Sequence, residues 1–195
     1  MIKYIQGGDI FDSHADALVN PVNCKGVMGK GIALEFKKRF PEYFRIYRET
    51  CIQEKLRPGI LLYVHLDVQP PLFENQQPAV VMFPTKDDWR KRSQLNWIED
   101  GLQFLKNHYK QWNIKSIALP QLGCGLGGLD WENVEPLIEK YFEGEDLEVE
   151  VYLNAVTKYR ERSKPEQVQD TTLQAFCQGC DCNEDTCEQR HPQSK

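Results

Sequence analysis

Two glycine-rich segments and one lysine have the residue types and spacing that suit the binding of an anionic ligand. The first segment, residues 19–41, reads VNPVNCKGVMGKGIALEFKKRFP, and Gly26, Gly29 and Gly31 stand in it between an apolar strand and a helix. Glycines at such a turn let backbone N–H groups approach a phosphate closely. The spacing is not that of a P-loop, because Gly31 follows Lys30 where Ser or Thr is required. A plain strand-to-helix turn is the alternative.

The second glycine-rich segment and the lysine also follow apolar runs. GCGLGG at residues 123–128 comes after the run 116–119, and the sequence Pro84-Thr85-Lys86 comes after the run 79–83. Ligands of open α/β sheets bind beyond the carboxyl ends of the strands. The three loops are therefore predicted to meet at one rim and to hold a ligand that carries phosphate.

The elements that must position these loops alternate between strands and helices. The expected strands are residues 2–5, 16–22, 60–66, 79–83, 116–119 and 147–153. Helices are expected over residues 30–40, from residue 41, over 95–112 with Ser93 as N-cap, and after Asp130. Glu148 and Glu150 alternate with valines, which places the last strand at a sheet edge. The alternation predicts an α/β domain with a largely parallel sheet.

Composition limits the classes of function. The chain has 195 residues, 41% of them hydrophobic, and a formal net charge of -5. No apolar stretch approaches the roughly 18 residues of a membrane span, and the N-terminus lacks the apolar core of a signal peptide, so a cytoplasmic protein without membrane contact is expected. The negative charge disfavours a general electrostatic attraction to nucleic acid, so any such contact is expected to be local.

The C-terminal residues differ from the rest of the chain. Apolar periodicity is lost after Arg160, so we expect one domain over residues 1–157 and a polar linker with a cysteine-rich tail over 158–195. The tail contains candidate ligands for a structural zinc ion, namely Cys177, Cys180, Cys182 and Cys187, with His191 nearby. A flexible thiol-rich tail is the alternative. The dispersed Cys24, Cys51 and Cys124 are expected to be reduced.

Three segments together resemble the macro domain family, whose members bind ADP-ribose. They are VNCKGVMGKGIALEFKKRFP, FPTKDDWR and LGCGLGGLDWENV, and their residues are most similar to the DarG-like branch of DNA ADP-ribosyl glycohydrolases. The resemblance covers residues 1–157. It implies a three-layer α/β/α sandwich with a mixed central sheet of about six strands. It also implies a monomer that needs no cofactor.

The resemblance assigns roles to the loops. Asp9 would accept a hydrogen bond from adenine, although it can also be an ordinary turn carboxylate. Asn23 and the backbone of residues 26–33 would hold the distal ribose and one phosphate, and residues 123–127 would enclose the diphosphate. The full implied set is Asp9, Ile10, Asn20, Val22, Asn23, Gly29, Lys30, Gly31, Ile32, Ala33, Thr85, Gly123, Cys124, Gly125, Leu126, Gly127 and Asn154.

Lys86 is the implied catalytic residue. A neutral lysine can attack the opened ribose to form a Schiff base, and a protonated lysine can assist the leaving base. The preceding apolar run and the nearby Arg90 would lower its pKa, whereas Asp87 and Asp88 would raise it, so the sequence leaves the direction open. A solvated loop lysine is the alternative reading.

Two features bear on the substrate. The branch that acts on protein glutamate esters has a catalytic aspartate where this chain has Gly127, which disfavours that mechanism. Trp89, with Arg90 and Lys91, is a candidate contact for single-stranded DNA through stacking and phosphate binding. Alternatively, Trp89 packs on the helix that follows Ser93.

Three functions are therefore weighed. The first is removal of ADP-ribose from nucleic acid bases, with thymidine in single-stranded DNA as the expected target. The second is hydrolysis of ADP-ribosylated protein carboxylates, and the third is a non-catalytic reader of ADP-ribose. ADP-ribose, ADP-ribosylated DNA and a cognate ADP-ribosyltransferase toxin are the implied partners.

Overall fold

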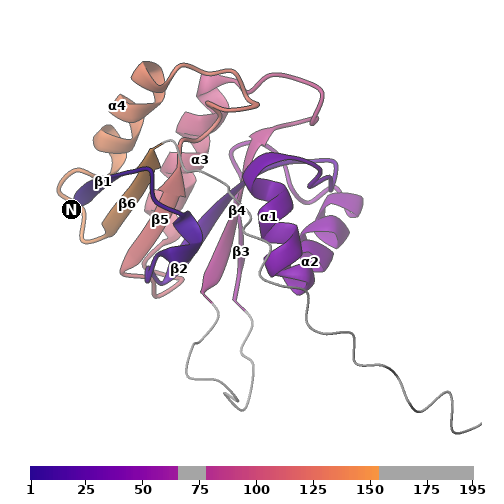
Figure 1. Ribbon diagram of the computed structural model, residues 1–195, viewed down its shortest axis with the longest axis horizontal. Coiled ribbons are helices and arrows are strands. Elements are labelled where there is room, and N and C mark those ends of the chain that lie inside the picture. The colour runs from indigo at the N-terminus through magenta and orange to yellow at the C-terminus, as the bar shows by residue number, and fades with distance from the viewer. Residues whose placement is uncertain (66–77, 154–195) are drawn as a thin grey trace, which may run out of the picture. The chain divides into compact units, whose positions relative to one another are not determined.

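The computed structural model describes residues 1–65 and 78–153 of the chain. Eleven elements lie in these ranges (Figure 1). The strands are β1 (Ile2–Gln6), β2 (Ala17–Asn23), β3 (Leu62–Val64), β4 (Ala79–Lys86), β5 (Ser116–Pro120) and β6 (Glu148–Leu153). The helices are η1 (Ile10–Asp12), α1 (Gly31–Arg39), α2 (Pro41–Ile52), α3 (Leu95–His108) and α4 (Trp131–Phe142).

The strands form one sheet of six strands in the order β1-β6-β5-β2-β4-β3. All neighbours are parallel except β3, which pairs antiparallel with β4. The predicted edge position of the last strand was wrong, because β6 pairs with β1 on one side and β5 on the other. Its alternating glutamates instead mark a partly open face: Glu148 is exposed, and Glu150 accepts a hydrogen bond from Ser13 Oγ at 2.7 Å.

Helices cover both faces of the sheet, with α3 and α4 on one face and α1 and α2 on the other (Figure 1), and each face has its own apolar cluster. Val19, Val81 and Phe83 pack with α3 and α4 in one cluster, whereas Leu18 and Met82 pack with η1, α1 and α2 in the other. Alternate residues of the same strand thus face opposite helical layers, because side chains alternate along a strand. The predicted three-layer α/β/α sandwich is confirmed.

The starts of two helices differ in their capping from what the sequence suggests. The N-cap of α3 is Gln94, and the prediction of Ser93 was wrong because the Ser93 side chain points into the second glycine-rich loop. Asp130 does occupy the N-cap position of α4, but its side chain makes no capping hydrogen bond within the described residues. The helix α3 ends at His108 rather than at residue 112.

Within residues 1–65 and 78–153, none of the helices has the length and apolar character needed to cross a bilayer.

Close packing of α3 on β4 depends on a glycine. A Cβ at Gly101 would lie 2.3 Å from Cζ of Phe83, whose side chain is fully buried. Helix propensity alone predicts that Gly101→Ala stabilises the protein by about 1 kcal/mol. We expect the opposite sign, a loss of about 1–3 kcal/mol in the free energy of unfolding, because the ring has no space into which to move.

The measurement is chemical denaturation followed by Trp fluorescence or circular dichroism. Gln103→Ala is the matched control, since Gln103 is exposed on the same helix and its replacement should change stability by less than about 0.5 kcal/mol. A Gly101→Ala protein more stable than the parent would contradict the packing argument.

Candidate ADP-ribose site

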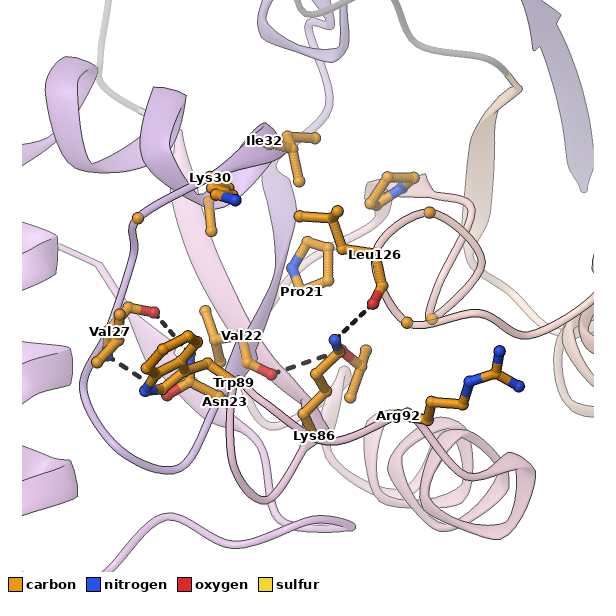
Figure 2. Close-up of a pocket in the computed structure, with 18 of the residues that line it drawn as sticks. Pro21, Val22, Asn23, Val27, Lys30, Ile32, Lys86, Trp89, Arg92 and Leu126 are labelled. Atoms are coloured by element: carbon orange, nitrogen blue, oxygen red, sulfur yellow. Dashed lines mark hydrogen bonds between the residues drawn. The ribbon is translucent and has the colours of Figure 1, made fainter.

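The ends of three neighbouring parallel strands open into one cavity. Asn23 ends β2, Lys86 ends β4 and Pro120 ends β5, and all three line a cavity of about 1080 Å³ (Figure 2). This size suits a ligand larger than a single phosphate, because typical ligand pockets measure about 300–1,000 Å³. The predicted convergence of three loops at one rim is therefore what the structure has.

The first glycine-rich loop is held in shape by Asn23. The Asn23 Oδ1 accepts hydrogen bonds from the backbone N–H of Lys25 at 2.9 Å and of Val27 at 3.4 Å, and its Nδ2 donates to the Val27 carbonyl at 2.6 Å. The buried Tyr47 hydroxyl donates to the Asn23 carbonyl at 2.7 Å. These bonds fix the loop before any ligand arrives, which lowers the entropy cost of binding.

The start of α1 faces the cavity with its backbone N–H groups available. Lys30 is the N-cap, in an extended conformation, and its side chain makes no capping bond in the described part of the chain. Gly31 has φ +59°, a conformation that favours glycine. An uncapped helix start carries unpaired donors and a partial positive charge, and both suit a phosphate.

The second glycine-rich loop is closed tightly around Gly127. A Cβ there would lie 2.1 Å from the Gly123 carbonyl oxygen and 2.4 Å from Ser93 Oγ. The Gly127 carbonyl accepts from the Ser93 N–H at 3.0 Å, and the Gly123 carbonyl accepts from the Leu129 N–H at 3.0 Å. An aspartate at position 127 would therefore require this loop to rearrange.

Lys86 reaches across the cavity to the second loop. Its Nζ donates to the Leu126 carbonyl at 2.6 Å, as Figure 2 shows. Burial lowers the pKa of the Lys86 amine below its usual value, which answers the direction that the sequence left open. The sequence left open that Asp87 and Asp88 raise the pKa of Lys86. In the structure these carboxylates instead pair with Lys91 at 3.3 Å and with Arg90 at 3.9 Å.

The lining of the cavity is strongly cationic. Among the described residues it contains five basic side chains and no Asp or Glu: Lys30, Lys86, Arg90, Lys91 and Arg92. The whole chain has a formal net charge of -5. Because Asp87 and Asp88 pair with Lys91 and Arg90, the positive charge of the lining comes mainly from Lys30, Lys86 and Arg92, and it suits an anionic ligand.

Most residues of the predicted binding set lie together here. The lining includes Val22, Asn23, Gly29, Lys30, Gly31, Ile32, Ala33, Thr85, Lys86, Gly123, Gly125, Leu126 and Gly127, together with the candidate DNA contacts Trp89, Arg90 and Lys91. The cavity thus joins the predicted phosphate loops to the predicted catalytic lysine and to the Trp89 segment.

Other predicted residues lie outside this lining. Asn20 is fully buried, with its Nδ2 3.5 Å from the sulfur of Met82, so it faces the core. Asp9 accepts from the Phe11 N–H at 3.0 Å and pairs with Arg39 at 3.3 Å, while Ile10 is buried in the same layer. These contacts give Asp9 a structural role, and its contact with adenine stays a prediction.

None of the three cysteines in the described residues lines the cavity, and this includes Cys124 of the predicted binding set. Cys24, Cys51 and Cys124 are free thiols, as expected. Burial raises the pKa of Cys124 to about 11, so it is a poor nucleophile near neutral pH. No group of His, Cys, Asp and Glu in these residues could hold a metal ion.

Asn154, the tail boundary and the four tail cysteines fall outside the described residues.

Several lining residues were missed by sequence reasoning. They are Pro21, Arg92, Pro120, Gln121 and Tyr152. Pro120 and Tyr152 lie at or near the carboxyl ends of β5 and β6, so the rule for ligand sites in α/β sheets indicated them. Arg92 carried no such signal, because its place beside Gly128 depends on how the second loop folds.

The sheet, the helical layers and the cationic cavity define an α/β module for an anionic ligand, and comparison with known families specifies the class. The model of the Macro domain family matches residues 19–138 of this chain. The chain therefore belongs to the macro domain family.

Individual relatives are found within this family. The chain is 41% identical over 154 residues to the DNA ADP-ribosyl glycohydrolase of Mycobacterium tuberculosis, covering 78% of this chain and 42% of the relative. It superposes on the macrodomain of M. tuberculosis DarG with a TM-score of 0.71 at 40% identity, covering 78% and 97%. It also superposes on Thermosipho africanus DarTG in complex with ADP-ribose with a TM-score of 0.70 at 38% identity, covering 75% and 40%. The chain thus spans about two fifths of the curated relative's length.

Proposed function

We propose that this chain is a DNA ADP-ribosyl glycohydrolase that removes ADP-ribose from modified bases, with thymidine in single-stranded DNA as its target. The observation that carries the proposal is the Lys86 amine, which projects between the two glycine-rich loops of a cavity that contains no carboxylate in its described lining. The activity named for the M. tuberculosis relative supports the same assignment.

The cavity suggests how ADP-ribose lies. The uncapped start of α1 and the loop at Gly125 would hold the diphosphate from two sides. Pro21, Ile32 and Tyr152 also line the cavity and would contact the adenine side of the ligand. The distal ribose then lies toward Lys86, where the bond to the base must break.

Lys86 can then act as a nucleophile. Its lowered pKa increases the neutral fraction of the amine at a given pH. The amine nitrogen bonds to the anomeric carbon, the bond from that carbon to the base breaks, and the base takes up the proton that the amine loses. The ribose ring then opens as the bond from the anomeric carbon to the ring oxygen breaks, and that oxygen takes up the remaining proton of the nitrogen, which leaves an imine. Water hydrolyses this imine and releases ADP-ribose and free lysine. This sequence needs no cofactor.

The two other functions fit the site less well. Hydrolysis of protein esters with a catalytic aspartate would need a side chain at position 127, where the Gly123 carbonyl leaves no space. A passive reader would not need a half-buried amine at the ribose end of the cavity.

A relative named as a fusion of DNA ADP-ribosyl transferase and glycohydrolase suggests an ADP-ribosyltransferase toxin as partner.

The proposal is tested by measuring ADP-ribose release from two substrates under equal conditions. One is single-stranded DNA with ADP-ribosylated thymidine, and the other is a protein with ADP-ribosylated glutamate. We expect release from the DNA alone. Release from the protein alone would support the ester reaction, and tight ADP-ribose binding without release from either substrate would support the reader.

The pH dependence of release follows from the direction of the Lys86 pKa shift. If the neutral amine attacks, kcat/KM rises with pH and becomes constant above the pKa of the Lys86 amine. This pKa lies below the ordinary lysine value of about 10.4. Borohydride added during turnover should then trap ADP-ribose on Lys86, as seen by mass spectrometry. A rate that falls with rising pH, without trapping, would instead assign Lys86 as a proton donor.

A further inference from the structure

We propose that residues 86–92 form a track for the DNA strand on both sides of the modified base, with Trp89 stacking one neighbouring base and Arg92 binding a backbone phosphate. The proposal rests on the proposed function and makes it narrower, because it states that the substrate is an oligonucleotide rather than a modified nucleoside.

Trp89 has an exposed ring at the rim of the cavity. Its exposed fraction is 48%, so a large part of the indole is open to a ligand. Val27 and Leu126, at the same rim, are exposed to 38% and 68%. Apolar groups gathered around a cavity mouth are a mark of a binding surface, and an aromatic ring there suits an unpaired base.

The Arg90 side chain contacts the Trp89 ring, so we do not assign it to a phosphate of the DNA. Its guanidinium carbon lies 4.5 Å from the centre of the Trp89 ring, and the guanidinium also lies 3.9 Å from Asp88. Lys91 is likewise paired, with Asp87 at 3.3 Å. The charges of the two residues that the sequence indicated as phosphate ligands are thus largely balanced within the segment.

Arg92 is the cation that this pairing leaves over. It is exposed, lines the cavity and has no ion pair within residues 1–65 and 78–153. Its side chain lies against the second loop, 3.6 Å from the position of a Cβ at Gly128. Figure 2 shows Trp89 and Arg92 on opposite sides of Lys86. A strand that places its modified base at Lys86 therefore meets an aromatic ring on one side and a cation on the other.

The track is attached to both glycine-rich loops. The Asp87 carbonyl accepts from the Cys24 N–H at 3.1 Å in the first loop, and the Ser93 N–H donates to the Gly127 carbonyl at 3.0 Å in the second. Between these anchors, the Arg90 N–H donates to Asp88 Oδ1 at 2.9 Å. The segment is thus fixed in place before DNA binds, so little ordering is needed on binding.

The experiment compares an ADP-ribosylated oligonucleotide with an ADP-ribosylated nucleoside, both bound to protein that carries Lys86→Ala to slow release. Adding Trp89→Ala should weaken binding of the oligonucleotide about 5–150-fold, the range of one stacked base, and should weaken nucleoside binding far less. Adding Arg92→Ala should weaken oligonucleotide binding and reduce the slope of log K against log salt by about 0.7, the value for one phosphate of a single strand.

Two controls and three contrary outcomes make the test decisive. Trp89→Phe should retain most of the oligonucleotide affinity, and Arg45→Ala, which removes an exposed arginine paired with Glu42 outside the lining, should have no effect. Equal losses for nucleoside and oligonucleotide, or no loss for either, would overturn the proposal. So would a Trp89→Ala effect confined to an ADP-ribosylated protein. Because binding is measured, failure of the wild type to release ADP-ribose would contradict only the proposed function.

Discussion

Replacing Lys86 with alanine is expected to lower the rate of ADP-ribose release from modified single-stranded DNA by about 10²–10⁴-fold, the usual contribution of a positioned proton-transfer group, or by more if the amine is the nucleophile. Binding of ADP-ribose should change little, because the two glycine-rich loops supply the phosphate contacts. The measurement combines single-turnover release with calorimetric titration of ADP-ribose. Turnover at the parent rate would refute the catalytic assignment.

Charge-preserving and distant controls separate chemistry from charge. Lys86→Arg keeps a cation at the ribose end but not a nucleophilic amine, so it should be as inactive as Lys86→Ala if the imine forms. Recovery of most of the rate by arginine would assign Lys86 an electrostatic role instead. Lys140→Ala removes a lysine that pairs with Glu99 at 2.8 Å outside the cavity lining, and it should leave release unchanged.

Placing alanine at Gly127 is expected to damage both folding and binding. The new Cβ would lie 2.1 Å from the Gly123 carbonyl oxygen, which is backbone and cannot rotate away. We expect a loss of about 1–3 kcal/mol or more in the free energy of unfolding. The displaced loop would also lose N–H bonds to the diphosphate, at about 1.5–3 kcal/mol each, which is about a 10–100-fold loss of ADP-ribose affinity per bond.

Gly125→Ala is the matched control for stability, since a Cβ there would meet nothing within 4 Å. It should unfold within about 0.5 kcal/mol of the parent. Gly127→Asp should lose ADP-ribose binding in the same way as Gly127→Ala and should not gain activity on glutamate esters. A stable Gly127→Asp protein that hydrolyses such esters would show that the loop can open and that Gly127 alone sets the substrate preference.

Lys86 and the two glycine-rich loops are linked to one another in this architecture. The Lys86 amine is bonded to the Leu126 carbonyl at the tip of the second loop, and Leu126 Cδ1 lies 3.7 Å from the position of a Cβ at Gly31 in the first loop. The two loops therefore meet across the cavity beside the amine. A diphosphate bound between them would keep the anomeric carbon near Lys86, which turns binding energy into orientation.

Local sequence patterns were enough to predict the α/β class, most helix and strand positions, and the occurrence of two glycine-rich loops and a lysine at strand ends. These features depend on short-range patterns, namely apolar periodicity within an element and glycines between elements. Three segments in the right order also indicated the macro domain family, which the match over residues 19–138 confirms.

Other features depend on contacts between distant parts of the chain and became known from the folded structure. The interior place of β6 requires β1, which pairs beside it from the other end of the domain. Ser93 caps no helix because its side chain is enclosed by the second loop, and Asn20 faces Met82 instead of the cavity. Arg92 remains without an ion pair among the described residues because Asp87 and Asp88 pair with Lys91 and Arg90 instead. Side-chain direction and charge pairing are set by long-range packing, and no local pattern encodes them.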